Sequence, residues 1–168
     1  MTGGQMTSQT LTPPRHRRRF SALALLCLTV LGCAIGATGG SREVVSTAGA
    51  AGAIGPYSQA VWAGNTLYLS GQIGIDPATG QLVPGGFEAE AKRALDNCRT
   101  ILSAAGLTLA DVVQVQVFLA DMADYAALNA VYAPYFPAQP PARAAIGVAA
   151  LPRGARVEIL MTAARPAR

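Results

Sequence analysis

Two periodicities follow each other in residues 87–119, F-E-A-E-A-K-R-A-L-D-N-C-R-T-I-L-S-A-A-G-L-T-L-A-D-V-V-Q-V-Q-V-F-L, and this stretch decides the fold. Apolar residues recur at three- and four-residue steps over Phe87–Ala105, and Gly106 follows, which predicts an amphipathic helix that ends there. Val112–Leu119 then alternates between apolar and polar residues, as expected of a strand. The side chains expected on the buried face of this strand are Val113, Val115, Val117 and Leu119.

Shorter segments on either side predict further strands and a second helix. The strand candidates are Arg42–Ser46, Gln59–Trp62, Thr66–Ile73, Ala144–Ala149 and Arg156–Ala163. Turn residues at 63–65 predict a hairpin of the second and third strands, and those at 151–154 a hairpin of the last two. Asp121 or Asp124 can cap a helix that runs to about Tyr132. This order predicts an α+β fold in which two helices cover one face of a mixed β-sheet.

The other face of the predicted sheet has an unusual composition. The residues expected on it are Thr66, Tyr68, Ser70, Gln114, Gln116, Phe118, Glu158 and Leu160. A solvated sheet face normally carries more Lys and Glu, and a dry face carries fewer polar groups. This mixture of apolar and polar residues suggests contact with another subunit, with polar pockets at the subunit interface.

Charge divides the chain into two parts. The net charge is +4, but Arg15 and Arg17–Arg19 precede the first acidic residue, Glu43. From Arg42 onward, nine Lys or Arg residues balance nine Asp or Glu residues. Because a nucleic-acid-binding domain carries clustered basic residues, no nucleic-acid partner is expected.

Residues 1–33 have the pattern of an N-terminal signal segment, and residues 34–41 that of a linker rich in small residues. The arginines precede an apolar run at Phe20–Leu31, which is shorter than the roughly 20 residues of a membrane-spanning helix. The domain itself is expected at residues 42–165.

The signal segment allows two refinements and one alternative. Arg17–Phe20 resembles a twin-arginine signal, and Val30–Cys33 resembles a lipobox in which a lipid on Cys33 would tether the protein to a membrane. Either reading predicts an exported protein, periplasmic or anchored to the envelope. The alternative is an over-extended reading frame with its true start at Val44 or Val45, which would give a cytoplasmic protein.

Missing residue types exclude several kinds of active site. The only histidine, His16, precedes the domain, so neither a Ser-His-Asp or Cys-His catalytic set nor a His/Cys zinc site is available. Lys92 is the only lysine, and no glycine-rich phosphate-binding motif occurs. Cys98, on the apolar face of the predicted helix, has no cysteine partner within the domain. We expect no cofactor and no metal.

Arg143 and Glu158 are the strongest candidates for chemistry, because each stands alone in a strand-like apolar context. A guanidinium binds a planar carboxylate bidentately in a way that lysine cannot. A carboxylate can accept a proton from an attacking water if partial burial raises its pKa. Without further context, Arg143 could instead be a surface residue or a structural ion-pair partner, and Glu158 could be the partner of Arg143 or Arg156.

Six short motifs occur in order along the domain. They are G-P-Y-S-Q-A at 55–60, L-S-G-Q-I at 69–73, D-P-A-T-G at 76–80, L-N-A at 128–130, P-P-A-R at 140–143 and A-L-P-R-G-A-R-V-E-I at 150–159. Together they resemble the RidA (YjgF) family of reactive-intermediate deaminases, and the resemblance runs from about residue 42 to residue 165.

The resemblance implies a chorismate-mutase-like α+β fold, the YjgF fold, that trimerises around a central β-barrel with sites at the subunit clefts. It implies hydrolysis of 2-imino acids, and their enamine tautomers, to 2-keto acids and ammonia. Arg143 would bind the substrate carboxylate, and Glu158 would handle the attacking water, with Tyr57 as a further catalytic candidate. The other positions that would line the pocket are Ser70, Gly71 and Asn129.

The chain departs from the family pattern at two places. Ala144-Ala145 replaces a frequent Ser-Cys or Ser-Thr pair, which leaves at most a backbone contact from Ala145, and Leu160 replaces a frequent second glutamate. Both departures bear on the rate and the substrate range expected of this chain. Export is also unusual, because the imino acids familiar to this family arise in the cytoplasm.

Other readings remain at this point. Tyr57 could be core packing, Ser70-Gly71 a β-bulge, and Asn129 a solvent-facing residue. An alternative for the whole protein is a non-catalytic trimer of the same fold that binds small carboxylates at the cell envelope. An RNA-acting protein is a third reading, against which the neutral domain and the absence of histidine argue.

Overall fold

The structure is a computed structural model that describes residues 1–2 and 42–165. The predictions for the signal segment, the linker at 34–41 and Cys33 therefore lie outside the described residues. Within residues 42–165 the elements are β1 (Glu43–Val45), β2 (Ala60–Ala63), β3 (Thr66–Leu69), α1 (Phe87–Ala104), β4 (Val112–Leu119), α2 (Tyr125–Tyr132), β5 (Ala142–Gly147) and β6 (Val157–Ala164). This is the predicted order of strands and helices.

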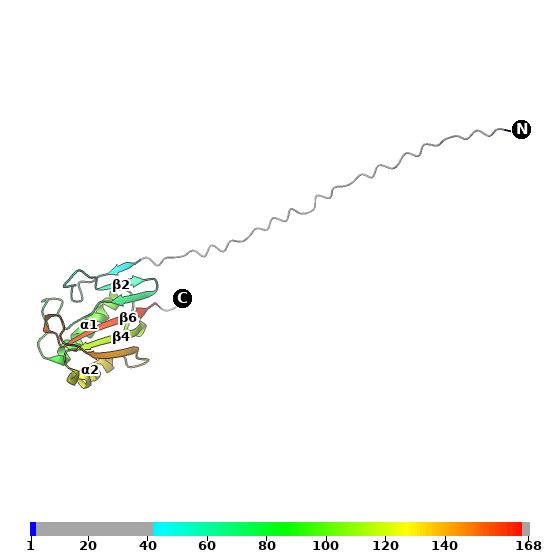
Figure 1. Ribbon diagram of the computed structural model, residues 1–168. Coiled ribbons are helices and arrows are strands. Elements are labelled where there is room, and N and C mark those ends of the chain that lie inside the picture. The colour runs from blue at the N-terminus through cyan, green and yellow to red at the C-terminus, as the bar shows by residue number, and fades with distance from the viewer. Residues whose placement is uncertain (3–41, 166–168) are drawn as a thin grey trace. The chain divides into compact units, whose positions relative to one another are not determined.

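The six strands form one mixed sheet with the spatial order β1-β2-β3-β6-β4-β5, in which only β4 and β5 are parallel (Figure 1). The predicted hairpin of β2 and β3 is confirmed, since Ala63 pairs with Thr66 across the turn. The predicted hairpin of the last two strands is wrong. β5 pairs with β4, whereas β6 lies between β3 and β4.

The burial of the two strands explains this arrangement. Every second side chain of β6 is at most 2% exposed, namely Val157, Ile159, Met161 and Ala163. A strand with such a dry face needs neighbours on both edges to satisfy its backbone groups and to exclude water. β5 carries alanines, Ile146 and Gly147, is half-buried or exposed throughout, and lies at the edge of the sheet.

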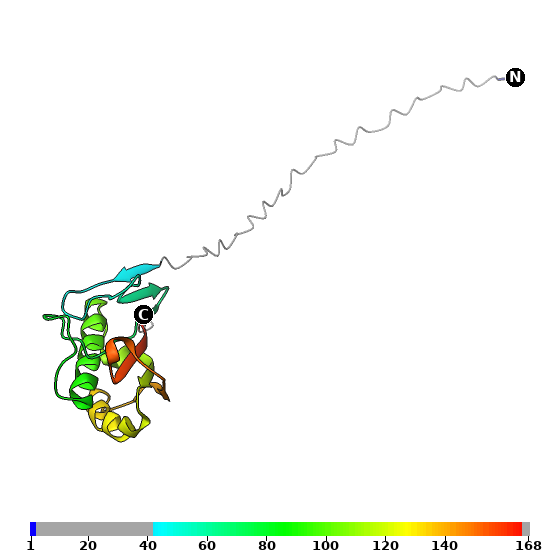
Figure 2. The same ribbon diagram turned by 60° about the vertical axis from the view of Figure 1, so that its left-hand side comes forward.

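Helices α1 and α2 pack against each other, and α1 lies on β6, so both cover one face of the sheet (Figure 2). The apolar stripe of α1 is buried as predicted, and Cys98 within it is fully buried. The helix ends at Ala104, and Gly106 follows with a φ of 74°, a left-handed conformation that glycine adopts without strain. The prediction for α1 is therefore correct to within one residue.

One side chain of β4, Val113, does not lie on the buried face of the sheet, where the sequence predicts it. Val113 is 51% exposed, and its neighbour Val112 is buried instead. The pairing with β6 shifts between Val112 and Gln114, which is a β-bulge. Since an extra residue reverses the alternation, the buried face is as predicted only from Val115 onward.

The face of the sheet that lacks helices carries large side chains that remain partly or fully exposed, among them Tyr68, Phe118, Ile146, Glu158 and Leu160. This is the mixed apolar and polar face that the sequence predicts, and we refer to it as the open face. Among the described residues, no helix is long and apolar enough to span a membrane.

Candidate functional site

Glu158 stands on β6 opposite Phe118 of β4, and therefore on the open face of the sheet. Its carboxylate lies directly against Gly71. A Cβ atom built on Gly71 would be 1.7 Å from Glu158 Oε1 and 2.6 Å from Cδ. Only a residue without a side chain leaves room for the carboxylate in this position.

A β-bulge places Gly71 there. Tyr68 pairs with Thr162, and the next paired residues are Gln72 and Ile159, so β3 and the segment that follows it contribute one residue more than β6 over this interval. The structural reading of Ser70-Gly71 as a bulge is thus correct, and the bulge is also what carries Gly71 to Glu158.

Partial burial raises the pKa of Glu158 above its usual value of 4.5. Neither candidate ion-pair partner contacts it: Arg156 binds both carboxylate oxygens of Asp124 at 3.0 Å, and Arg143 binds Asn129. The readings of Glu158 as the partner of Arg143 or Arg156 are therefore wrong within this chain. A half-buried carboxylate without a cation beside it is a stronger base than an exposed one.

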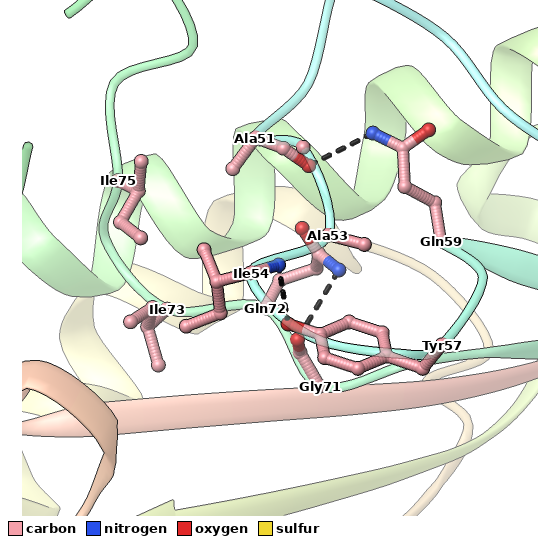
Figure 3. Close-up of a pocket in the computed structure, with 10 residues that line it drawn as sticks. Ala51, Ala53, Ile54, Tyr57, Gln59, Gly71, Gln72, Ile73 and Ile75 are labelled. Atoms are coloured by element: carbon pink, nitrogen blue, oxygen red, sulfur yellow. Dashed lines mark hydrogen bonds between the residues drawn. The ribbon is translucent and has the colours of Figure 1, made fainter. Parts of the chain in front are cut away.

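Tyr57 and Gly71 line the same cavity of about 20 Å³, which has room for about one water molecule (Figure 3). The Tyr57 hydroxyl accepts a hydrogen bond from the Ile54 N–H at 3.1 Å, while the residue as a whole is 47% exposed, so Tyr57 is not core packing. Ser70 Oγ donates to the Ser58 carbonyl at 2.6 Å. Gly71 therefore contacts Glu158 and shares a cavity with Tyr57, and Ser70 precedes it in the chain. We call Tyr57, Ser70, Gly71 and Glu158 the glutamate half-site.

Arg143 on β5 belongs to a second group. Its Nη2 donates to Asn129 Oδ1 at 2.5 Å, so Asn129 does not merely face solvent. The guanidinium carbon lies 4.5 Å from the centre of the Tyr132 ring and 5.9 Å from that of Tyr125. Ala145, two residues along β5, shares this face and packs against the core. We call Arg143, Asn129, Tyr125 and Tyr132 the arginine half-site.

The groups around Arg143 are neutral. Burial raises the pKa of Tyr132 to about 12, so its phenol stays protonated, and the amide of Asn129 carries no charge. Ion pairs within residues 42–165 involve Lys92, Arg99 and Arg156, and none involves Arg143. The positive charge of Arg143 is therefore not compensated within the described part of the chain, as a site for an anion requires.

The two half-sites lie on opposite faces of the sheet. Arg143 is opposite Val115, which is opposite the buried Met161, so the arginine is on the helix-covered side. Glu158, opposite Phe118, is on the open face. One protomer therefore does not bring Arg143 and Glu158 into a single pocket.

Sequence reasoning missed the two tyrosines of the arginine half-site. Tyr125, Asn129 and Tyr132 are spaced four and three residues apart, which places them on one face of α2. That spacing was readable in the sequence. The position of β5, which brings Arg143 to the same face of α2, is not encoded in that spacing.

Comparisons with known proteins show the family of the chain. The family model described as endoribonuclease L-PSP matches residues 47–165. The 2-iminobutanoate/2-iminopropanoate deaminase of Capra hircus is 58% identical over 118 residues, which is 70% of this chain and 86% of that protein.

Solved structures share the fold. RidA from the Antarctic bacterium Psychrobacter sp. PAMC 21119 is 46% identical with a TM-score of 0.71, and the match covers 73% of this chain and 99% of that one. E. coli TdcF with bound serine is 38% identical with a TM-score of 0.71, over 74% and 99% of the two chains. The expected YjgF-type fold is confirmed, and the chain belongs to the RidA (YjgF) family, whose family model carries the description endoribonuclease L-PSP.

Proposed function

We propose that this protein is a hydrolytic deaminase that converts reactive 2-imino acids, and their enamine tautomers, to 2-keto acids and ammonia. The observation that carries the proposal is Arg143, an arginine held only by neutral groups. Such a residue fits a substrate that brings its own carboxylate. The 58% identity to a 2-iminobutanoate/2-iminopropanoate deaminase supports the same substrate class.

The proposed chemistry needs one base and a positioned water. Arg143 holds the substrate carboxylate, and the water oxygen attacks the C2 carbon of the C=N group while Glu158 accepts a proton from that water. Attack on the protonated imine gives a neutral carbinolamine, and Glu158 returns the proton to its nitrogen. The C–N bond then breaks as the hydroxyl oxygen forms the C=O bond and loses its proton to Glu158, and the departing ammonia takes up that proton and leaves a 2-keto acid. Because free imines already hydrolyse in water, positioning and a general-base contribution of about 10²–10⁴-fold suffice.

We propose that a homotrimer completes the site. Arg143 and Glu158 lie on opposite faces of the sheet in one protomer, so a second copy has to supply one of them. The open face, with its exposed Tyr68 and Ile146, offers the surface that subunits would cover. Trimerisation around this face would form the central β-barrel expected of the family.

A trapping assay tests the activity. An amino-acid oxidase generates 2-iminopropanoate or 2-iminobutanoate in situ, semicarbazide traps the remaining imine, and trapping is compared with and without the purified full-length chain. We expect faster loss of trappable imine that disappears in Arg143→Ala and falls strongly in Glu158→Gln. A folded trimer without effect on a panel of imines would contradict the proposal.

Subunit mixing tests the shared site. Arg143→Ala and Glu158→Gln chains, each nearly inactive, are unfolded together and refolded at equal amounts. If neighbouring subunits supply the two residues, each mixed trimer regains one intact site, and about a quarter of the wild-type activity returns. If both residues acted within one subunit, mixing would restore nothing.

A trimer that only binds small carboxylates is the second candidate, and the serine-bound structure of E. coli TdcF favours it. A pure binder needs Arg143 but not Glu158. Equal imine loss with wild-type protein and without protein, together with tight binding of 2-oxobutanoate that Arg143→Ala abolishes, would establish this alternative. We do not propose an RNA substrate, because the domain has balanced charge and no histidine.

We propose that the chain is exported, with a lipid on Cys33 as the anchor. The arginine cluster, the apolar run and the lipobox-like Val30–Cys33 support this location. Fractionation of cells that express the full-length chain, with Cys33→Ser as the matched variant, tests it. A soluble cytoplasmic product that begins at Val44 or Val45 would contradict export and support the shorter reading frame.

A further inference from the structure

We infer that Tyr132, assisted by Tyr125, is a positioning residue for Arg143, and that it acts through the face of its ring rather than through its hydroxyl. The inference rests on the proposed function, since it assigns to these tyrosines the orientation of the group that binds the substrate carboxylate. It concerns α2, from which sequence reasoning had drawn only Asn129.

The geometry of the contact leaves the donors of Arg143 available. A guanidinium offers five N–H donors around its edge, and its flat faces carry none. Asn129 takes one Nη2 donor, while the guanidinium carbon lies 4.5 Å from the centre of the Tyr132 ring. A ring at that distance attracts the cation without accepting its N–H groups. A carboxylate in the same place would consume donors and neutralise the charge.

The Tyr132 ring is itself fixed. It is 6% exposed, and it stacks on Phe136 with ring centres 4.6 Å apart and an interplanar angle of 28°. Arg143 is half-buried, and an arginine loses much rotamer freedom when it binds a ligand. A rigid ring beneath the guanidinium removes part of that cost before the substrate arrives.

The Tyr132 hydroxyl contributes no hydrogen bond. It is the one buried side-chain polar atom without a partner in the described part of the chain. An orphaned buried hydroxyl is unfavourable for stability, so what this position supplies to Arg143 is an aromatic face. The ring is the part that the inference requires, and a phenylalanine would supply it equally.

The chain contains a matched control. Tyr135, one helical turn further on, places its ring 5.8 Å from Arg99. Arg99 is paired with Asp96 at 2.8 Å, and the Tyr135 hydroxyl donates to Asp96 at 2.9 Å. This second tyrosine–arginine pair is neutralised by a carboxylate and takes no part in the arginine half-site. Loss of its ring reports the general cost of removing a tyrosine from this region.

The test compares full-length wild type with Tyr132→Leu, Tyr132→Phe, Tyr125→Leu and Tyr135→Leu. Calorimetric titration with 2-oxobutanoate measures carboxylate binding without turnover, and its uncharged amide serves as the probe without a carboxylate. The trapping assay then gives KM and kcat for 2-iminobutanoate. Circular dichroism and sedimentation establish that each variant is folded and assembled as wild type is.

We expect Tyr132→Leu to raise both the Kd for 2-oxobutanoate and the KM by about 5- to 30-fold, with kcat changed less than about threefold. Binding of the amide should be unaffected. Tyr132→Phe and Tyr135→Leu should remain within about twofold of wild type, and Tyr125→Leu, at its longer distance, should lose about two- to fivefold.

Wild-type carboxylate binding by a folded Tyr132→Leu variant would overturn the inference, and so would an equal loss in Tyr132→Phe, which would assign the effect to the hydroxyl. If Tyr132→Leu does not fold, the exposed Tyr125 decides: unchanged carboxylate binding in Tyr125→Leu overturns the inference. If wild type binds 2-oxobutanoate but hydrolyses no imine, the proposed function fails while the binding comparison still tests the tyrosines.

Discussion

The two half-sites are built in different ways. Side chains hold Arg143, since an amide binds one of its donors and two aromatic rings lie against its guanidinium. Backbone shape holds Glu158: a bulge brings Gly71 beneath the carboxylate, and the absence of a Cβ atom gives it space. The first half-site therefore depends on which residues surround it, whereas the second depends on where the main chain runs.

This difference predicts different kinetic signatures. The arginine half-site binds a group that does not change during the reaction, so damage to it should weaken ground-state and transition-state binding together. The glutamate half-site moves a proton, so damage to it should lower kcat. Each substitution below tests whether the two half-sites separate in this way.

The largest effect is expected from Arg143→Lys. A lysine keeps the charge but cannot form the bidentate contact with a carboxylate or present a planar, delocalised cation to the Tyr132 ring. We expect kcat/KM for 2-iminobutanoate to fall by about 10²-fold or more, mainly through KM. Arg156→Lys is the control, because Arg156 pairs with Asp124 on the surface and should leave activity unchanged. Comparable losses in both variants would contradict the distinction between them.

Gly71→Ala should have the next largest effect. The new methyl group would occupy the position of Glu158 Oε1, so the carboxylate has to move. We expect kcat to fall by about 10- to 100-fold with a smaller change in KM, since a displaced base loses most of its contribution. Gly52→Ala is the matched control, because Gly52 lines the same cavity as Tyr57 and Gly71, yet a Cβ built there meets no atom within 4 Å outside its flanking residues. Full activity in Gly71→Ala would show that the position of Glu158 is not critical.

The pH dependence of kcat should identify Glu158 as the base. Burial raises the pKa of this carboxyl above 4.5, and only the ionised form accepts a proton. As the pH falls through that raised pKa, kcat should fall by up to about tenfold per pH unit. Glu158→Gln should be slow and should lack this acidic limb, whereas Arg143→Lys should retain it. An acidic limb that persists in Glu158→Gln would assign the base to another group.

Local signals in the sequence were sufficient for much of the fold. The periodicity of α1 and the turn between β2 and β3 involve residues within a few positions of each other, and both predictions are confirmed. Pairing of distant strands is not encoded in this way. The turn at residues 151–154 pointed to a hairpin, yet the dry face of β6 required a central position between β3 and β4.

The candidate site shows the same contrast between local signals and the pairing of distant strands. Arg143 and Glu158 were identified because each stands alone in an apolar context, and the structure shows both without a salt-bridge partner among the described residues. Their placement on opposite faces follows from strand register, and so does the meeting of Tyr132 with Arg143. Register combines residues far apart in the chain, so the motifs alone do not indicate it.

The smallest expected effect is a change in thermal stability, which arises because the base of the glutamate half-site, Glu158, is partly buried. The pKa of Glu158 is higher in the folded state than the 4.5 of an ordinary carboxyl, so folding favours its protonated form. The contribution of this carboxyl to the free energy of unfolding is therefore fully present below pH 4.5 and is lost as the pH rises through the raised pKa. At neutral pH the ionised carboxylate destabilises the folded protein, and Glu158→Gln should remove that cost.

We expect the Tm of Glu158→Gln to exceed that of wild type by on the order of 1 °C at pH 7.5, and the difference to vanish near pH 4. Thermal unfolding at both pH values measures it. A lower Tm for the glutamine variant at pH 7.5 would mean that the ionised carboxylate is stabilised by a partner, and Glu158 would then be a structural residue rather than the destabilised base that the reaction requires.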